Sequence, residues 1–303
     1  MNGSLHTIDG RSVLKFERRL AHPPEKVWRA ITETEHLAQW FPAEMQGERK
    51  QGAPIRFVFA GDGAPPENGE ITEYDPPRLF SYTWGESELH WELRPDGDGC
   101  LLLFGHTFDE RPNAASFATG WQRCLDGLAR VLAGRPSPAG AASEVAASRA
   151  YRVRHEAYVE VFELLAGTAE PAGRDTGGWL VRFERLLPYP ADEVWAALTG
   201  GITPVAGDPA PLPATAEHAP PGPVNAVEPE ALLAYDSPAG TVRWTLSPGP
   251  GGTLVVLTQQ AADRVAALAG WHARLESLAA TLAGPPTGTD PAELRARYAE
   301  PAG

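Results

Sequence analysis

Two stretches of the chain repeat one another: residues 16–32 (FERRLAHPPEKVWRAIT) and residues 183–199 (FERLLPYPADEVWAALT). Nine of their 17 aligned positions are identical, whereas about one would match by chance at ordinary residue frequencies. Both stretches place an alternating apolar segment before a proline and then a Val-Trp pair, at Val27 and Trp28 in the first copy. A repeat of this kind predicts two copies of one structural unit.

The similarity continues in the same order along the chain. Residues 88–104 align with 241–257, and residues 120–134 align with 270–284, where eight of 15 positions are identical. The length of 303 residues also fits two domains. We therefore predict a first domain at 12–134, a linker at 135–177 with a helix at about 148–166, a shortened second domain at 178–284, and a tail at 285–303 with a short helix.

The pattern within each copy predicts an α+β fold. Alternation around Phe16 predicts a strand, and a short helix with an apolar face follows at Val27. Short apolar segments separated by Gly, Pro and Asp then predict an antiparallel meander. Residues 114–133 carry apolar side chains at intervals of three to four, as expected for one long helix packed on that sheet. The second copy has no counterpart of the segment HLAQWFPAEM (36–45), and residues 200–223 are expected to be irregular.

Composition limits the classes of partner and compartment. The formal net charge of −13 argues against nucleic acids and anionic membranes, which need a basic surface. No apolar run approaches the ~18 residues of a membrane span, and no signal peptide is apparent. The two cysteines are too few for a disulfide framework, so a cytoplasmic protein is expected. Among the 26 basic residues only Lys15, Lys26 and Lys50 are lysine, a bias that coding DNA of high GC content produces.

The order of these motifs resembles the SRPBCC superfamily (START/Bet v1-like, helix-grip fold), and most closely its AHSA1-like branch in a tandem, two-domain form. The residues that carry the resemblance lie in both copies; they are Pro24, Val27, Trp28, Trp40, Phe41, Pro42, Trp91, Leu93, Gly120, Trp121 and Leu128, and Val194, Trp195, Trp244, Leu246, Gly270, Trp271 and Leu278. The resemblance implies two curved antiparallel sheets, each wrapped on a long C-terminal helix. It also implies a cavity between sheet and helix that takes a hydrophobic small molecule.

Large aromatic side chains and two arginines are the candidates for lining such a cavity. In the first copy they are Arg18, Trp40, Phe41, Phe57, Tyr82, Trp84, Trp91, His106 and Trp121, and in the second Arg185, Tyr235, Trp244 and Trp271.

The polar candidates each have two interpretations. Arg18 and Arg185 share strand parity with apolar neighbours, so each is either a fork for a ligand carboxylate or carbonyl, or an arginine that pairs within its domain or reaches water. His106 is either an acid/base group or a hydrogen-bonded edge histidine, and Gln259 takes its place in the second copy. Cys124 is expected to be a buried, unreactive thiol.

No phosphate-loop, Rossmann, zinc-protease or nucleophile-elbow motif is present. The histidines and cysteines lack the spacing of metal ligands. We therefore expect neither a cofactor nor a metal.

Three functions remain open. The first is binding of a hydrophobic small molecule, including a linear polyketide, by an accessory or self-resistance protein of polyene- or enediyne-like biosynthesis. The second is a polyketide aromatase/cyclase, with Arg18 and His106 as the first catalytic candidates. The third is an Hsp90-type cochaperone, which we disfavour because such proteins carry a separate N-terminal domain. In each case the two domains are expected to contact one another through the helix near 148–165.

Overall fold

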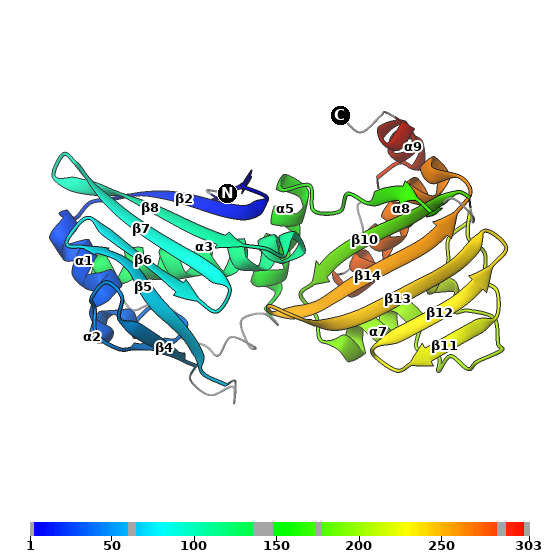
Figure 1. The fold of residues 1–303 in the computed structure, drawn as a ribbon, viewed down its shortest axis with the longest axis horizontal. Coiled ribbons are helices and arrows are strands. Elements are labelled where there is room, and N and C mark those ends of the chain that lie inside the picture. The colour runs from blue at the N-terminus through cyan, green and yellow to red at the C-terminus, as the bar shows by residue number, and fades with distance from the viewer. Residues whose placement is uncertain (1–2, 60–64, 136–147, 174–176, 284–288, 300–303) are drawn as a thin grey trace. The chain divides into compact units, whose positions relative to one another are not determined.

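The computed structural model describes residues 3–59, 65–135, 148–173, 177–283 and 289–299. The chain divides into two compact units, Met1–Tyr158 and Val159–Gly303, and each carries one antiparallel sheet (Figure 1). Parts of the expected linker (136–147), the end of the second copy (284) and parts of the expected tail (285–288 and 300–303) lie outside the described residues.

The first unit contains an eight-stranded sheet in the order β1-β2-β8-β7-β6-β5-β4-β3. Its strands are β1 (Gly3–Ile8), β2 (Arg11–Leu20), β3 (Glu44–Gln46), β4 (Pro54–Val58), β5 (Glu67–Asp75), β6 (Leu79–Trp84), β7 (Ser87–Asp96) and β8 (Gly99–Phe108). Its helices are α1 (Pro24–Thr32), α2 (Thr34–Leu37), η1 (Arg111–Asn113), α3 (Ala114–Leu132) and α5 (Arg149–Val161), and the division between the units falls within α5.

The second unit contains a six-stranded sheet in the order β11-β12-β13-β14-β10-β9. Its strands are β9 (Thr168–Pro171), β10 (Trp179–Leu187), β11 (Val224–Glu228), β12 (Leu232–Ser237), β13 (Gly240–Gly249) and β14 (Gly252–Ala261). Its helices are α7 (Ala191–Thr199), η2 (Leu212–Ala214), α8 (Arg264–Ala283) and α9 (Pro291–Ala299).

The core of each unit lies between its sheet and its long helix, α3 or α8 (Figure 1). Strand β8 buries alternate residues, among them Leu102 and Phe104, and α3 buries Trp121, Leu125 and Leu128 against them. This match between a period of two and a period near 3.6 is what the sequence pattern predicts. The α+β fold class with two helix-grip domains is confirmed.

The two sheets share six strands in the same spatial order, with β9, β10, β14, β13, β12 and β11 corresponding to β1, β2, β8, β7, β6 and β5. Among its described residues, the second unit has no counterpart of β3 and β4, the strands that follow the Trp40–Phe41 segment. Residues 200–223, which we call the strap, take their place. Apart from η2, the strap holds only the isolated bridges Pro209–Pro223 and Ala216–Ala219.

The edge strands β1 and β9 were not expected from the sequence. Strand β1 pairs with β2 although it lies before residue 12, and β9 pairs with β10 from within the expected linker. Both are largely exposed and polar, so they lack the alternation that identifies a half-buried strand.

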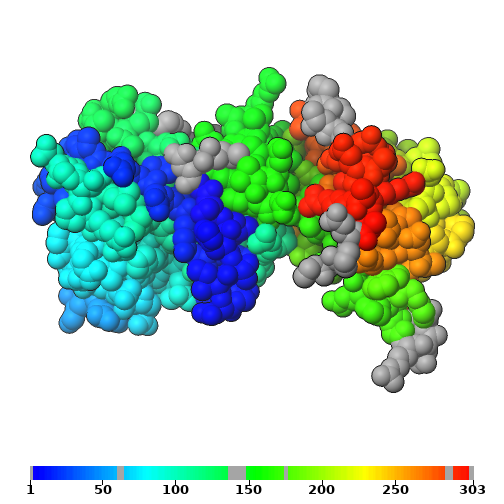
Figure 2. Space-filling view, turned by 90° about the horizontal axis from the view of Figure 1, so that it is seen from above, coloured from blue at the N-terminus to red at the C-terminus, as the bar shows by residue number. Residues whose placement is uncertain are grey.

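The helix expected in the tail is present as α9, which packs on α8 (Figure 2, red). His272 Nδ1 of α8 lies 2.8 Å from the hydroxyl oxygen of Tyr298 of α9. Leu294 of the same helix α9 is also buried. None of the helices in the described ranges is both long and apolar enough to cross a membrane.

Candidate ligand-binding site

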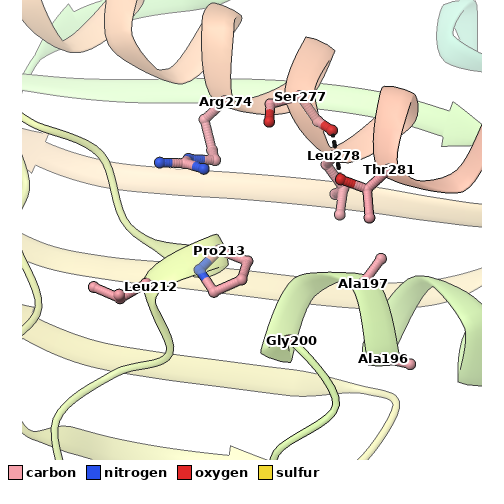
Figure 3. A pocket seen from close by; sticks show the side chains of 9 residues that line it. All are labelled: Ala196, Ala197, Gly200, Leu212, Pro213, Arg274, Ser277, Leu278 and Thr281. Carbon is pink, nitrogen blue, oxygen red and sulfur yellow. Dashed lines mark hydrogen bonds between the residues drawn. The ribbon is translucent and has the colours of Figure 1, made fainter. Parts of the chain in front are cut away.

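The second unit contains a pocket of about 510 Å³ between α7, η2 and the C-terminal half of α8 (Figure 3). Small and apolar side chains make up most of its lining, which consists of Ala196, Ala197, Gly200, Leu212, Pro213, Arg274, Ser277, Leu278 and Thr281. Leu278 is buried, whereas Ala196, Leu212 and Ser277 are exposed, so the pocket opens to solvent. Arg274 is its one charged residue.

Local chain geometry brings the strap to the end of α7. Gly200 ends this helix in the left-handed conformation (φ 66°), which glycine adopts without steric penalty. A Cβ at Gly200 would lie 3.3 Å from Cγ of Pro213. The absence of a side chain therefore lets η2 approach the helix and form one wall of the pocket.

The carbonyl of Ala214 fixes the strap to the sheet. It accepts hydrogen bonds from Trp244 Nε1 (3.0 Å) and from the Tyr235 hydroxyl (3.2 Å). Both donors are fully buried, and an unpaired buried donor is costly. The two aromatic residues thus hold a chain of small residues at the position that bulky side chains occupy in the first unit.

Arg274 is half-buried at the pocket wall, and its side chain extends toward the strap (Figure 3). Burial lowers the pKa of its guanidinium, and the nearby Tyr235 acts in the opposite direction. An arginine nevertheless keeps its charge in proteins. Within the described residues, the Arg274 side chain has no hydrogen-bond or ion-pair partner.

The first unit has a thiol at the equivalent position. In the alignment of the two long helices, Cys124 of α3 corresponds to Arg274 of α8. Within its own unit each of them lies near a tyrosine, Tyr82 in the first unit and Tyr235 in the second. Cys124 is buried, and burial raises its pKa to about 12. The same helix position therefore holds a buried thiol in the first unit and a guanidinium at an open pocket in the second.

Aromatic rings occupy the space between sheet and helix in the first unit. This aromatic cluster consists of Trp40, Phe41, Phe57, Tyr82, Trp84, Trp91, Phe104 and Trp121. Phe57 stacks on Trp84 with ring centroids 4.2 Å apart, and Phe104 lies 4.5 Å from Trp121. All except Trp84 are buried. The structure therefore places these residues in ring-to-ring packing contact.

The Trp40–Phe41 segment belongs to the same packing. Trp40 Nε1 donates to the carbonyl of Ala30 (2.9 Å), and the Phe41 ring lies 6.0 Å from the Trp121 ring. Trp91 Nε1 donates to the Tyr82 hydroxyl (3.3 Å). The indole N–H groups of Trp40 and Trp91 are thus paired within the unit.

His106 accepts a hydrogen bond at Nδ1 from Trp121 Nε1 (3.0 Å). Burial, with a smaller effect of Arg11, lowers its pKa to about 3, so the imidazole is neutral near pH 7. In the second unit Gln259 Oε1 accepts from Trp271 Nε1 (2.6 Å). Both units therefore use this strand position as an acceptor for the indole that leads the long helix.

The two candidate arginines connect a strand to the long helix. Arg18 is half-buried and donates to Gln122 Oε1 (2.9 Å) of α3. Arg185 is buried and donates to the carbonyl of Leu275 (3.0 Å) of α8. This geometry is that of an arginine paired within its domain, one of the two interpretations that the sequence left open.

The four candidates of the second unit do not line the pocket, and sequence reasoning missed the nine residues that do. Arg185, Tyr235, Trp244 and Trp271 all lie in the core beside it. One signal was present in the sequence: an arginine in the second copy aligns with Cys124, a position where the first copy is apolar.

No group of three or more His, Cys, Asp or Glu residues in the described part of the chain could hold a metal ion. Cys100 and Cys124 are both free and buried.

Residues 21–133 match the model of the family described as activator of Hsp90 ATPase homolog 1-like protein. This span begins directly after β2 and ends directly after α3, so it covers strands β3 to β8 and the long helix of the first unit. The first unit is an AHSA1-like domain. The family resemblance expected from the sequence is thereby confirmed, and the AHSA1-like unit has a fold of the ligand-binding type.

Several solved structures are similar to the chain over about one unit. CalU16 from Micromonospora echinospora is 27% identical, with 53% of this chain and 95% of that chain covered at a TM-score of 0.42. The conserved protein of unknown function EF2215 from Enterococcus faecalis is 20% identical, with 52% and 88% covered at 0.43. Protein MLL2253 from Mesorhizobium loti is 24% identical, with 40% and 97% covered at 0.37. No curated protein matches the chain.

Proposed function

We propose that the chain binds a hydrophobic small molecule and that the pocket of the second unit holds it. The observation that carries this proposal is the pocket itself, whose volume of about 510 Å³ lies within the ~300–1,000 Å³ typical of ligand sites. Mostly apolar walls with a few polar groups, of which Arg274 is the charged one, are also what such sites commonly present.

The surface near the pocket supports this assignment. Among the described residues, three of the seven exposed large apolar side chains, Ile202, Val205 and Leu212, belong to the strap. Exposed apolar side chains that gather on one segment are typical of a binding surface. The strap therefore offers an apolar approach to the pocket.

The aromatic cluster supports a different role for the AHSA1-like unit. Its rings already fill the region between sheet and helix, so a ligand there would have to displace packed side chains. In this proposal the AHSA1-like unit is a folded support, and the second unit is the binding unit.

The biological role we propose is that of an accessory or self-resistance protein in polyketide-type biosynthesis. The tandem helix-grip resemblance and the high-GC coding bias support this role. Nothing at Arg18 or His106 favours the alternative of an aromatase/cyclase, because Arg18 is engaged with Gln122 and His106 is neutral and bonded to Trp121. Native mass spectrometry of protein purified from its producing strain should detect a bound small molecule, and an empty protein that also ignores polyene ligands would contradict the role.

Binding itself can be tested with the neutral dye Nile red. Ala197→Phe fills the pocket from α7, and Ala191→Phe is the matched control, because Ala191 is equally half-buried on the same helix but does not line the pocket. We expect the wild type and the control to bind the dye with enhanced fluorescence and Ala197→Phe to lose most of that binding. Circular dichroism should show that both variants are folded. A wild type without dye binding, or an Ala197→Phe variant that binds like the wild type, would refute the proposal.

A further inference from the structure

We propose that the pocket of the second unit selects amphipathic acids, that is, hydrophobic molecules with a carboxylate or similar anionic group, and that Arg274 binds this group. This inference rests on the proposed function, since it names the ligand class of the same pocket. It depends on the groups that surround Arg274 and on a comparison of its hydrogen-bond partners with those of the other partly buried arginines.

Arg274 differs from the other partly buried arginines in its partners. Arg49 of the first unit donates to three backbone carbonyls, those of Thr32, Gly47 and Met45, at 2.9–3.0 Å. Arg18 and Arg185 are also hydrogen-bonded. Arg274 has no such partner among the described residues, although burial lowers its pKa as it does that of Arg49. A partly desolvated cation gains most from an anionic partner.

The pocket supplies no anion of its own. Its nine lining residues include no Asp or Glu. The acidic residue nearest to Arg274 in sequence, Glu276, accepts two hydrogen bonds from Thr289, at Oε2 from the backbone N–H (2.9 Å) and at Oε1 from the hydroxyl (2.7 Å). The Tyr235 hydroxyl donates to the carbonyls of Ala214 and Ala219 (3.2 and 3.4 Å). The Glu276 carboxylate and the Tyr235 hydroxyl are thus already engaged, and the guanidinium is the charged group that the pocket offers to a ligand.

The shape of the pocket defines the rest of the ligand. The guanidinium lies on the strap side, while Ala197 and Leu278 line the pocket between α7 and α8 (Figure 3). A planar guanidinium can bind a carboxylate through two parallel hydrogen bonds. An acid with its carboxylate at Arg274 would therefore place its apolar body against Ala197 and Leu278.

The test compares decanoate with 1-decanol, two probes that share a ten-carbon chain and differ in charge. Displacement of Nile red gives the affinity of each at neutral pH and low salt. We expect decanoate to bind the wild type at least about tenfold more tightly than 1-decanol, as for a charge-assisted hydrogen bond. Arg274→Gln should remove this preference by weakening decanoate binding, so that the variant binds the two probes with similar affinity. Arg243→Gln is the matched control, because it removes the same charge from an exposed residue of the same unit.

The outcomes separate this inference from the proposed function. If neither probe binds the wild type, the proposed function fails. If both bind the wild type equally, or if Arg274→Gln keeps the preference for decanoate, the pocket binds apolar ligands but Arg274 does not select acids, and this inference is overturned. Loss of the preference in Arg243→Gln as well would show a general charge effect and would also overturn it.

Discussion

The two units build the same six strands and then fill the space above them differently. In the first unit Trp91 donates to Tyr82, the Trp40 ring packs on Trp91, and the Phe41 ring packs on Phe57. In the second unit the equivalent Trp244 and Tyr235 both donate to the carbonyl of Ala214 in the strap. The polar groups are satisfied in both units, but the small residues of the strap occupy less volume than the rings do. A pocket can therefore arise without any change in the order of the six shared strands.

The largest loss of stability is expected when a ring is removed from the aromatic cluster. Phe41 is buried and lies 5.6 Å from Trp84 and 6.0 Å from Trp121 (ring centroids). We expect Phe41→Ala to lower the free energy of unfolding by about 3–5 kcal/mol, as for other buried Phe→Ala changes that leave a cavity. Urea denaturation followed by tryptophan fluorescence measures this loss.

Leu212→Ala in the strap is the control for that change, because Leu212 is 71% exposed. Its effect should stay within about 0.5 kcal/mol. A loss below about 1 kcal/mol for Phe41→Ala would mean that the cluster is not a packed core.

The stability of the two units should depend differently on pH. The indole N–H of Trp121 donates to His106 in the first unit, whereas that of Trp271 donates to Gln259 in the second. Unfolded histidine takes up a proton near pH 6.5, whereas folded His106 does so only near pH 3. Unfolding therefore binds a proton in this range, so the stability contributed by neutral His106 is complete above pH 6.5 and falls as the pH decreases toward 3. The loss is up to about 1.4 kcal/mol per pH unit.

His106→Gln copies the acceptor Gln259 of the second unit and should remove this pH dependence. Urea denaturation of wild type and variant between pH 7 and pH 4.5 isolates the contribution of His106, because all other titrating groups are the same in both. Parallel curves for the two proteins would show that His106 is not held neutral in the folded state.

The two tyrosines should differ in how much their hydroxyls stabilise the fold. Tyr82→Phe leaves the buried N–H of Trp91 without its acceptor, which is expected to cost about 1–3 kcal/mol. Tyr235→Phe removes a donor instead, and the carbonyl of Ala214 still accepts from Trp244, so about 1 kcal/mol is expected. Thermal or urea denaturation measures the loss of stability in each variant. A larger loss for Tyr235→Phe than for Tyr82→Phe would contradict the role given to the Ala214 carbonyl in the strap.

The smallest change in stability is expected for Arg274→Cys, which places the residue of the first unit into the open pocket. Burial raises the pKa values of Cys100 and Cys124 to about 11 and about 12, so both native thiols should react slowly with a thiol reagent at pH 8. The introduced thiol at position 274 should react much faster, since the pocket is open to solvent. Equal rates for native and introduced thiols would show that the two positions do not differ in access.

The fold could be predicted from the sequence because its signals are local and repeated. The alternation around Phe104, the spacing of Trp121, Leu125 and Leu128, and the second copy of each pattern all specify the same layers. The edge strands β1 and β9 escaped because they are short, polar and largely exposed.

The site was harder to predict because the pocket lies where the second copy has the strap in place of the aromatic segment 36–45. Large aromatic side chains such as Trp84 and Trp91 suggest a cavity wall equally well as a filled core, and only three-dimensional packing distinguishes the two. The pocket instead depends on small residues such as Ala197 and Gly200 and on the unusual conformation of the strap. Arg274 was visible in the alignment of the two copies, but its lack of a partner among the described residues was not.

Hydrogen–deuterium exchange with and without saturating decanoate tests most directly whether the second unit alone is the binding unit. The account predicts slower exchange in peptides that cover α7, η2 and residues 272–282 of α8, with no change in α3 or in residues 36–45 of the first unit. Slower exchange in α3 and residues 36–45, with α7 and α8 unaffected, would place the ligand in the AHSA1-like unit and contradict the account.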